Sequence, residues 1–183
     1  MTDNQLIQLL SDLIDAAVTA GGWSSFVPPT IQKNQPTQQG TPTGSAVFIE
    51  KLFDDPYGWP STKMEYNSVT NVYDETETQL YRTTFQVSGL VKQDPTQVDM
   101  PTASDVVNFV KSYVASRHIA MQLQSQNGIG VERVTNVRNP PFQDDSSQFE
   151  FHPNFDMVVS YSRDVVFTTP AADRVVPDGI FPI

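Results

Sequence analysis

Residues 81–91 read YRTTFQVSGLV. Tyr81, Phe85 and Val87 stand at odd positions of this stretch, whereas most even positions hold polar side chains such as Arg82 and Gln86. A two-residue period of this kind is typical of a β-strand that buries one face and exposes the other. We therefore predict a strand here, and the remaining elements are placed around it.

Segments on either side of this strand carry the three- to four-residue period of amphipathic helices. The first begins at Thr2, which fits a capping box with Gln5, and ends at Gly21-Gly22. Its apolar positions are Leu6, Ile7, Leu10, Leu13, Ile14, Ala17 and Val18. The second begins after a cap at residues 102–105 and frays near residues 117–118. Its apolar positions are Val106, Val107, Phe109, Val110, Tyr113 and Val114.

Further strands are expected on both sides of residues 81–91. Residues 46–49 (AVFI) begin a strand that the turn-rich residues 54–60 (DDPYGWP) close, and residues 62–73 form a further strand or an extended arm. An extended segment at residues 131–137 and the alternating residues 149–161 form a long hairpin, with a turn at residues 144–147.

The order of these elements predicts an α+β fold. We expect a mixed or antiparallel sheet with a long β-hairpin, packed by two main helices. At 183 residues the chain is long enough for one domain, which we place at residues 1–167 with loop or arm excursions at residues 32–45 and 54–78. Residues 168–183 are expected to form an extended C-terminal arm.

The composition excludes several classes of function. The net charge of -10, with only 11 basic residues, argues against a protein that binds nucleic acid tightly, because neutralising the phosphates requires clustered Lys and Arg side chains. Without cysteine the chain has no disulfide, thiolate nucleophile or zinc-thiolate site. No run of about 18 apolar residues is present, so we expect no membrane span.

No catalytic, cofactor-binding or metal-binding site is predicted. His118 after a helix end and His152 before a proline are interpreted as structural residues. The acidic pairs Asp54-Asp55 and Asp144-Asp145 lack the spacing of a calcium loop and stand beside turn-forming residues. Residues 128–130 (GIG) lack the third glycine of a nucleotide-binding loop and are interpreted as a turn.

Aromatic and apolar residues outside the periodic segments are the candidates for contacts between subunits. They are Trp23, Phe26, Trp59, Ile180, Phe181 and Ile183. The last three belong to a proline-rich end whose apolar content is unusual for a disordered tail. We expect this end to lie on a neighbouring subunit, with folding back onto its own domain as the alternative.

The order of elements resembles the tail-terminator-like fold of the neck proteins of tailed bacteriophages. Residues 31–36 leading to residues 46–49 resemble the lead-in to that family's first strand, residues 81–87 its central strand and residues 105–113 its sheet-covering helix. Residues 137–142 (VRNPPF), 144–145 and 155–161 (FDMVVSY) resemble its closing strands. The insertion at residues 54–78 and the tail from Thr169 are longer than that compact fold needs.

The resemblance implies a structural virion protein that assembles in the host cytoplasm. Members form a ring, usually a homo-hexamer, where the head connector meets the tail tube. The ring terminates the tube and lets DNA pass without tight binding, so its partners are a head-completion or connector protein and the tail tube protein. Two alternatives stay open: another head-completion or tail-tube protein, and a monomeric α+β domain that binds a small ligand or catalyses a reaction.

Overall fold

The computed structural model describes residues 1–32, 44–92, 96–143 and 149–170. One helix, three strands, two helices and four strands follow one another in the described residues, which is an α+β order, as expected. Their bounds are α1 Asp3–Ala20, β1 Ile31–Gln32, β2 Ala46–Asn67, β3 Val72–Leu90, α2 Ala103–Val114, α3 Arg117–Asn127, β4 Gly130–Val134, β5 Pro141–Gln143, β6 Phe149–Phe151 and β7 Asn154–Pro170.

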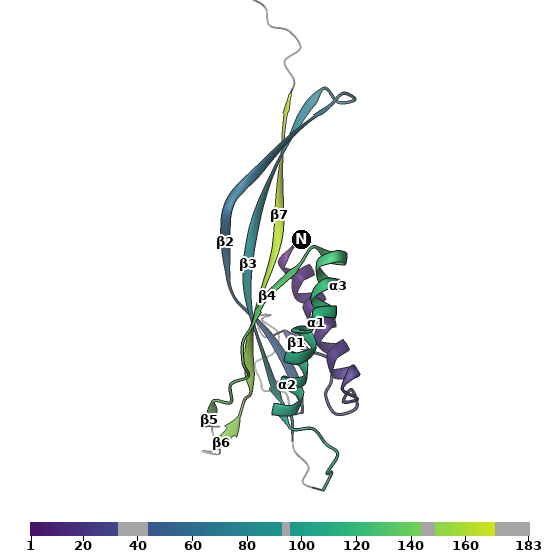
Figure 1. Ribbon diagram of the computed structural model, residues 1–183, viewed down its shortest axis with the longest axis vertical. Coiled ribbons are helices and arrows are strands. Elements are labelled where there is room, and N and C mark those ends of the chain that lie inside the picture. Colours follow the sequence, from purple (N-terminus) through teal and green to yellow (C-terminus); the bar gives the residue numbers. More distant parts are fainter. Residues whose placement is uncertain (33–43, 93–95, 144–148, 171–183) are drawn as a thin grey trace, which may run out of the picture.

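The main sheet has five strands in the order β1-β2-β3-β7-β4. β1 runs parallel to β2 and the other pairs are antiparallel, so the sheet is mixed. β5 and β6 form a separate two-stranded sheet. The three helices lie together on one face of the main sheet and cover only one end of it (Figure 1).

The core lies between that face and the helices. Along β7 the buried residues Phe155, Met157, Val159 and Tyr161 alternate with half-buried ones, which is the pattern of a strand with one covered face. The helices bury Leu6, Leu10, Ile14, Val106, Val107, Val110 and Val114 against it. Each such side chain contributes about 1.5–3 kcal/mol when fully buried, so the helix-covered end holds the stability of the fold.

The predicted starts of both helices and the end of the first are confirmed by their capping contacts. The second helix ends at Val114 rather than near residues 117–118. Thr2 and Gln5 form the capping box of α1, and Gly21 caps its C-terminus. Thr102 and Asp105 form the capping box of α2. A third helix, α3, follows α2 directly and ends at Gly128, whose φ of 67° is in the left-handed region that suits glycine.

The predicted turn at residues 54–60 is wrong. β2 runs through these residues to Asn67, with irregularities between Lys51 and Phe53 and between Tyr57 and Ser61. The second irregularity contains Gly58, whose φ of 73° accommodates the extra residues of a bulge. At this point β2 is an edge strand, and a proline on the outer side of an edge strand removes no hydrogen bond to a neighbouring strand. The strand can therefore continue through residues that would otherwise favour a turn.

The hairpin predicted from residues 131–161 is only partly right. β4 pairs with β7 in an antiparallel manner, but the β5–β6 sheet lies between them in the chain. The long hairpin of the fold is instead β2–β3, and β7 lengthens it by pairing with β3 as far as Pro170. The predictions for the turn at residues 144–147, the acidic pair Asp144-Asp145 and most of residues 32–45 lie outside the described residues.

Candidate functional site

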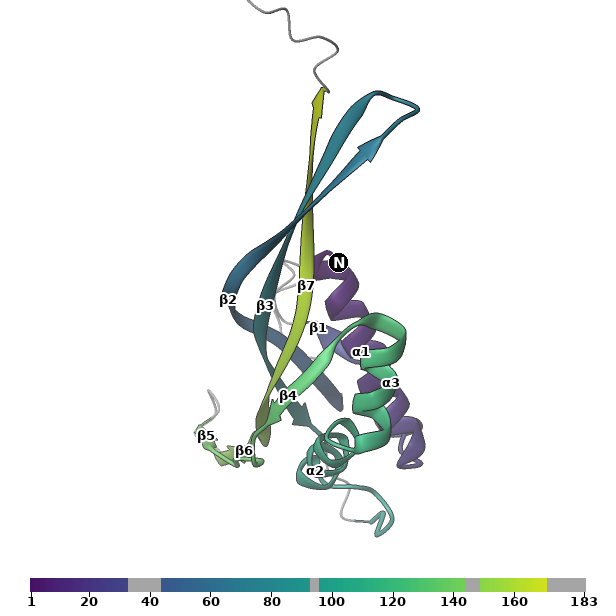
Figure 2. The same ribbon diagram turned by 45° about the horizontal axis from the view of Figure 1, so that its top comes forward.

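Three strands continue beyond the helices as a long arm (Figures 1 and 2). We call residues 53–82 of β2 and β3, together with residues 162–170 of β7, the β-arm. It carries many exposed apolar side chains: Phe53, Trp59, Met64, Tyr66, Val69, Tyr73, Leu80, Val165, Val166 and Phe167. These side chains are spread over both faces, the bulge and the turn of the β-arm, and such an accumulation of exposed apolar residues is typical of a contact with another protein.

The register of the strands divides the β-arm into two faces, because cross-strand neighbours share a face. The helix-side face continues the row that is buried by the helices, and the open face is the opposite one. The helix-side face carries Met64, Tyr66, Tyr73, Glu75, Glu77, Val165 and Phe167. The open face carries Asp55, Lys63, Glu65, Asp74, Arg82 and Asp164, among which acidic side chains outnumber basic ones.

The β-arm also has two outer edges without a neighbouring strand among the described residues. β1 covers the outer edge of β2 only as far as Ile49. β4 covers the outer edge of β7 only as far as Ser160. Exposed strand edges present unpaired backbone groups that are ready to pair with another chain.

The base of the β-arm is tied to the N-terminus of α1 by a network of charges. Asp3 accepts hydrogen bonds from Lys51, at 2.7 Å, and from Arg163. Lys51 also bonds Asp54, which in turn accepts a hydrogen bond from Thr83. Residues of four elements, α1, β2, β3 and β7, thus meet where the helix-covered core ends.

Aromatic rings complete the same junction. The Arg163 guanidinium donates a hydrogen bond to the Tyr161 hydroxyl at 2.8 Å. It also lies 5.0 Å from the centre of the Tyr81 ring and 5.4 Å from that of Tyr161, within the range of cation–π attraction. Arg163 is therefore held by both charge and packing.

The electrostatics of the junction favour the charged forms of its members. Burial raises the pKa of Asp54, but hydrogen bonds from Lys51 and Thr83 outweigh burial and hold the pKa below its ordinary value. Burial lowers the pKa of Lys51, but the hydrogen bonds from Lys51 to Asp3 and Asp54 outweigh the effect of burial and raise the pKa above its ordinary value. The junction is thus an ionic clamp rather than a group poised for proton transfer near neutral pH.

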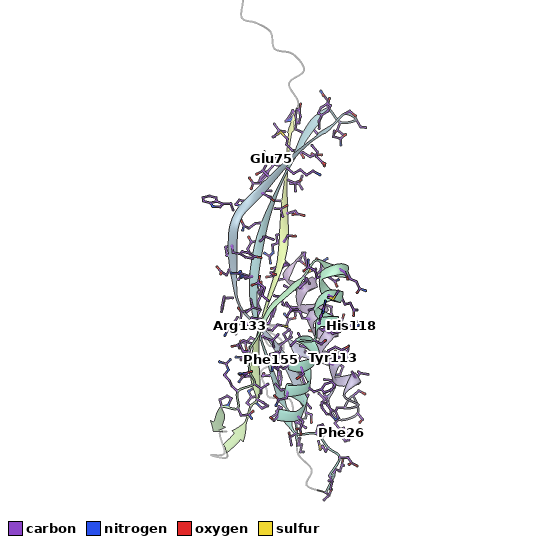
Figure 3. All side chains as sticks on the ribbon, in the orientation of Figure 1. Phe26, Glu75, Tyr113, His118, Arg133 and Phe155 are labelled. Atoms are coloured by element: carbon purple, nitrogen blue, oxygen red, sulfur yellow. The ribbon has the colours of Figure 1, made fainter. Side chains whose placement is uncertain are left out.

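The predicted contact residues do not come together. Trp23 and Phe26 are half-buried against the core of their own chain, and Trp23 packs edge-on against Phe109 at 5.3 Å. Phe26 lies at the opposite end of the molecule from Glu75 in the β-arm (Figure 3). Trp59, in the bulge of β2, is 96% exposed. Ile180, Phe181 and Ile183 lie outside the described residues.

The residues considered for catalysis or metal binding are also separate. His118 is exposed and follows the end of α2 at Val114, as expected, but it lies in the first turn of a further helix, α3. His152 packs edge-on against Phe48 at 6.2 Å. Asp54 and Asp55 are consecutive strand residues and point to opposite faces of the sheet. In the described part of the chain, no three His, Asp or Glu residues are grouped so that they could hold a metal ion.

Sequence patterns do not reveal the junction or the free edge of β7. Asp3 and Arg163 are 160 positions apart, and each is a charged residue of ordinary appearance. The one available signal for the length of β7 is the run Val165-Val166-Phe167, in which β-branched and aromatic residues favour a strand.

Comparisons with known proteins identify the family. A comparison with curated proteins gives no match. None of the helices in the described residues is long and apolar enough to cross a membrane. A family model described as E217 gateway protein gp29 matches residues 5–171, which include α1 from its third residue, the other two helices, the main sheet and the whole β-arm. The chain therefore belongs to the E217 gateway protein gp29 family, a phage head–tail protein family, in agreement with the expected phage neck protein.

Proposed function

We propose that this chain is a structural subunit of the phage neck that assembles with copies of itself into a ring. The observation that carries the proposal is the β-arm, with apolar side chains exposed on strands whose two outer edges lack a neighbour among the described residues. Family membership supports a structural role between head and tail. The ring terminates the tail tube and joins it to the head connector.

The two edges of the β-arm support a ring over a two-fold dimer. One edge belongs to β2 and the other to β7, so a contact between them joins unlike surfaces of two copies. Such a head-to-tail contact repeats from copy to copy and closes into a ring when the rotation allows it. Six copies are expected from the resemblance to tail terminators.

The charge of the chain supports a channel through which DNA passes without being held. The open face of the β-arm carries Asp55, Glu65, Asp74 and Asp164 against Lys63 and Arg82. In a ring whose helices lie outside, this face lines the lumen and repels phosphates. We expect the affinity for duplex DNA at physiological salt to be weaker than about micromolar, in the range of non-specific binding. Tighter binding of duplex DNA in a filter or fluorescence assay would contradict the proposal that DNA passes through the channel without being held.

The C-terminal arm extends these contacts to the neighbours. The first three residues of the predicted arm, 168–170, belong to β7 and pair with β3. We propose that residues 171–183, with Ile180, Phe181 and Ile183, lie on an adjacent subunit or on a connector or tube protein above or below the ring. Deleting residues 174–183 is expected to leave the circular dichroism spectrum of the monomer unchanged and to reduce assembly in sedimentation velocity. A deleted chain that assembles normally would contradict this role.

Assembly of the purified chain tests the proposed function directly. We expect sedimentation velocity and negative-stain microscopy to show closed rings, alone or on tail tubes. The double variant His118→Ala, His152→Ala is a matched control, because neither residue lies in the β-arm and it is expected to assemble like the parent. A chain that stays monomeric in the presence of tubes, or that has a turnover lost in this double variant, would favour the ligand-binding or catalytic alternative.

A further inference from the structure

We propose that the outer edge of β7, residues 162–169, pairs in parallel with the outer edge of β2, residues 61–67, of a second copy of this chain. The β-arms of neighbouring copies then form one continuous sheet. The inference rests on the proposed ring and specifies the contact that builds it.

The backbone of β7 presents a regular row of hydrogen-bonding groups at this edge. Asn154 exchanges backbone hydrogen bonds with Arg138 at 2.8 and 2.9 Å, and the carbonyl of Asp156 accepts one from Thr135 at 2.9 Å. Even-numbered residues of β7 therefore point their N–H and C=O groups toward the β4 side. The pairing of β7 with β3 continues without a register shift to Pro170. The outward groups beyond β4 thus belong to Ser162, Asp164, Val166 and Thr168.

This edge also lacks two of the features that protect exposed edges from pairing, prolines and bulges, although it carries the charged residues Arg163 and Asp164. From Tyr161 to Thr169 β7 has no proline, glycine or bulge, and it carries Val165, Val166 and Phe167, each at least half exposed. A long, regular and apolar edge of this kind promotes uncontrolled association unless a specific partner covers it. The outer edge of β7 is therefore suited to pair with a strand of another chain.

The edge of β2 supplies a suitable partner strand. Its stretch around Pro56 and Pro60 is blunted by the prolines and the bulge, but residues 61–67 pair with β3 in unbroken register and contain neither proline nor glycine. β2 and β7 both run antiparallel to β3 and so point the same way. Copies related by rotation about an axis along the β-arm keep that direction, so the two edges meet in parallel.

The side chains of the two edges match on both faces. On the helix-side face, Val165 and Phe167 of one copy lie beside Met64 and Tyr66 of the next, and these four apolar side chains are between 50% and 61% exposed before pairing. On the open face, Asp164 lies beside Lys63, which within its own chain pairs with the exposed Glu65. Two apolar pairs thus meet on the helix-side face and one pair of opposite charges meets on the open face, where Val166 lies beside Glu65.

Engineered disulfides test the pairing, because the chain has no cysteine of its own. Neighbouring strands lie about 4.8 Å apart, which is within the Cα separation that a disulfide spans. We expect Lys63→Cys with Asp164→Cys, oxidised after assembly, to give a ladder of covalent oligomers on a non-reducing gel. The matched control is Lys63→Cys with Val165→Cys, whose side chains lie on opposite faces, and it is expected to give no ladder.

A proline at an outward-facing position tests the same edge without cross-linking. Val166→Pro removes an N–H that points away from β3, whereas Val166→Ala removes the same side chain and keeps that N–H. We expect Val166→Pro to keep the circular dichroism spectrum and to weaken association at least tenfold relative to Val166→Ala.

The outcomes separate the pairing from the ring itself. A Lys63–Asp164 ladder together with weaker association of Val166→Pro supports the pairing. Rings without that ladder, or equal association of the two Val166 variants, overturn the proposed pairing of β7 with β2 but agree with the proposed ring. Dimers that stop at two copies and cross-link through Asp164→Cys alone would overturn it in favour of β7 pairing with β7. A parent chain that never associates overturns both proposals.

Discussion

Helix α2 comes close to the sheet at Gly89. A Cβ added there would lie 2.6 Å from a methyl carbon of Val107, which is fully buried, and 3.7 Å from the carbonyl oxygen of Ala103. Carbon atoms in contact normally lie about 3.5–4.0 Å apart, so Gly89→Ala forces the helix and the sheet apart. Overpacking of this kind costs about 1–3 kcal/mol, and the better strand propensity of alanine returns about 0.5–1 kcal/mol. We expect a net loss of about 0.5–2 kcal/mol in the free energy of unfolding.

A second substitution assigns this loss to the contact. Val107→Ala removes the clashing methyl groups and by itself costs about 1.6 kcal/mol for two buried carbons, plus a term for the cavity. In the double variant the methyl group introduced at position 89 occupies part of that cavity, so the double loss is expected to be about 1–2 kcal/mol smaller than the sum of the two single losses. Val114→Ala is the matched control, since this buried valine lies about 10 Å further along the same helix and its effect should add to that of Gly89→Ala.

Urea unfolding followed by circular dichroism provides the measurement, at a protein concentration below that of association. The transition midpoint is expected to shift at constant slope, because the exposed surface does not change. A Gly89→Ala variant as stable as the parent, or a Gly89–Val107 pair that is as additive as the control pair, would refute the close approach of α2 to β3.

Three further outcomes are expected from single residues. Trp59→Ser should change the unfolding free energy of the monomer by less than about 0.5 kcal/mol, because the side chain is almost fully exposed. The same variant should assemble less in sedimentation velocity, and unchanged assembly would show that Trp59 is not in the interface. Thr102→Ala should cost about 1 kcal/mol by removing the capping box with Asp105, and an unchanged thermal midpoint would contradict this. The pKa of Asp54 is lowered, so its contribution to the folding stability is lost as the pH falls below 3.8. The pKa of Lys51 is raised, so its contribution is lost as the pH rises above 10.5. Both contributions are full between about pH 5 and 10. The stability difference between the parent and Asp54→Asn should therefore shrink as the pH falls below 3.8, and a difference that stays constant as the pH falls would contradict the clamp.

Local patterns in the sequence predicted much of the fold. The alternation at residues 81–91 is the helix-covered part of β3, and the capping boxes at Thr2 and Thr102 mark the starts of α1 and α2. These features were predictable because burial on one face and helix capping depend on residues that are close together in the chain. The α+β class followed from their order.

The charge and the motifs also bounded the function from the sequence alone. An acidic chain without cysteine, and without a recognised catalytic or phosphate-binding motif, pointed to a structural role, and the resemblance pointed to the phage neck. The family match agrees with that class of protein. The ring, its stoichiometry and its position as a terminator stay predictions.

Tertiary structure alone decided where the chain can meet its neighbours. Pro56, Gly58 and Pro60 have the local signature of a turn, yet β2 continues through them because their outer side faces no other strand among the described residues. The ionic clamp joins Asp3 to Arg163 across 160 positions. Among the described residues, the edge of β7 is open because β4 stops pairing at Ser160. Whether a strand lies at an edge, and which charges meet, depends on chain segments that are distant in sequence. No local pattern contains that information, since both properties are set by pairing across the whole sheet.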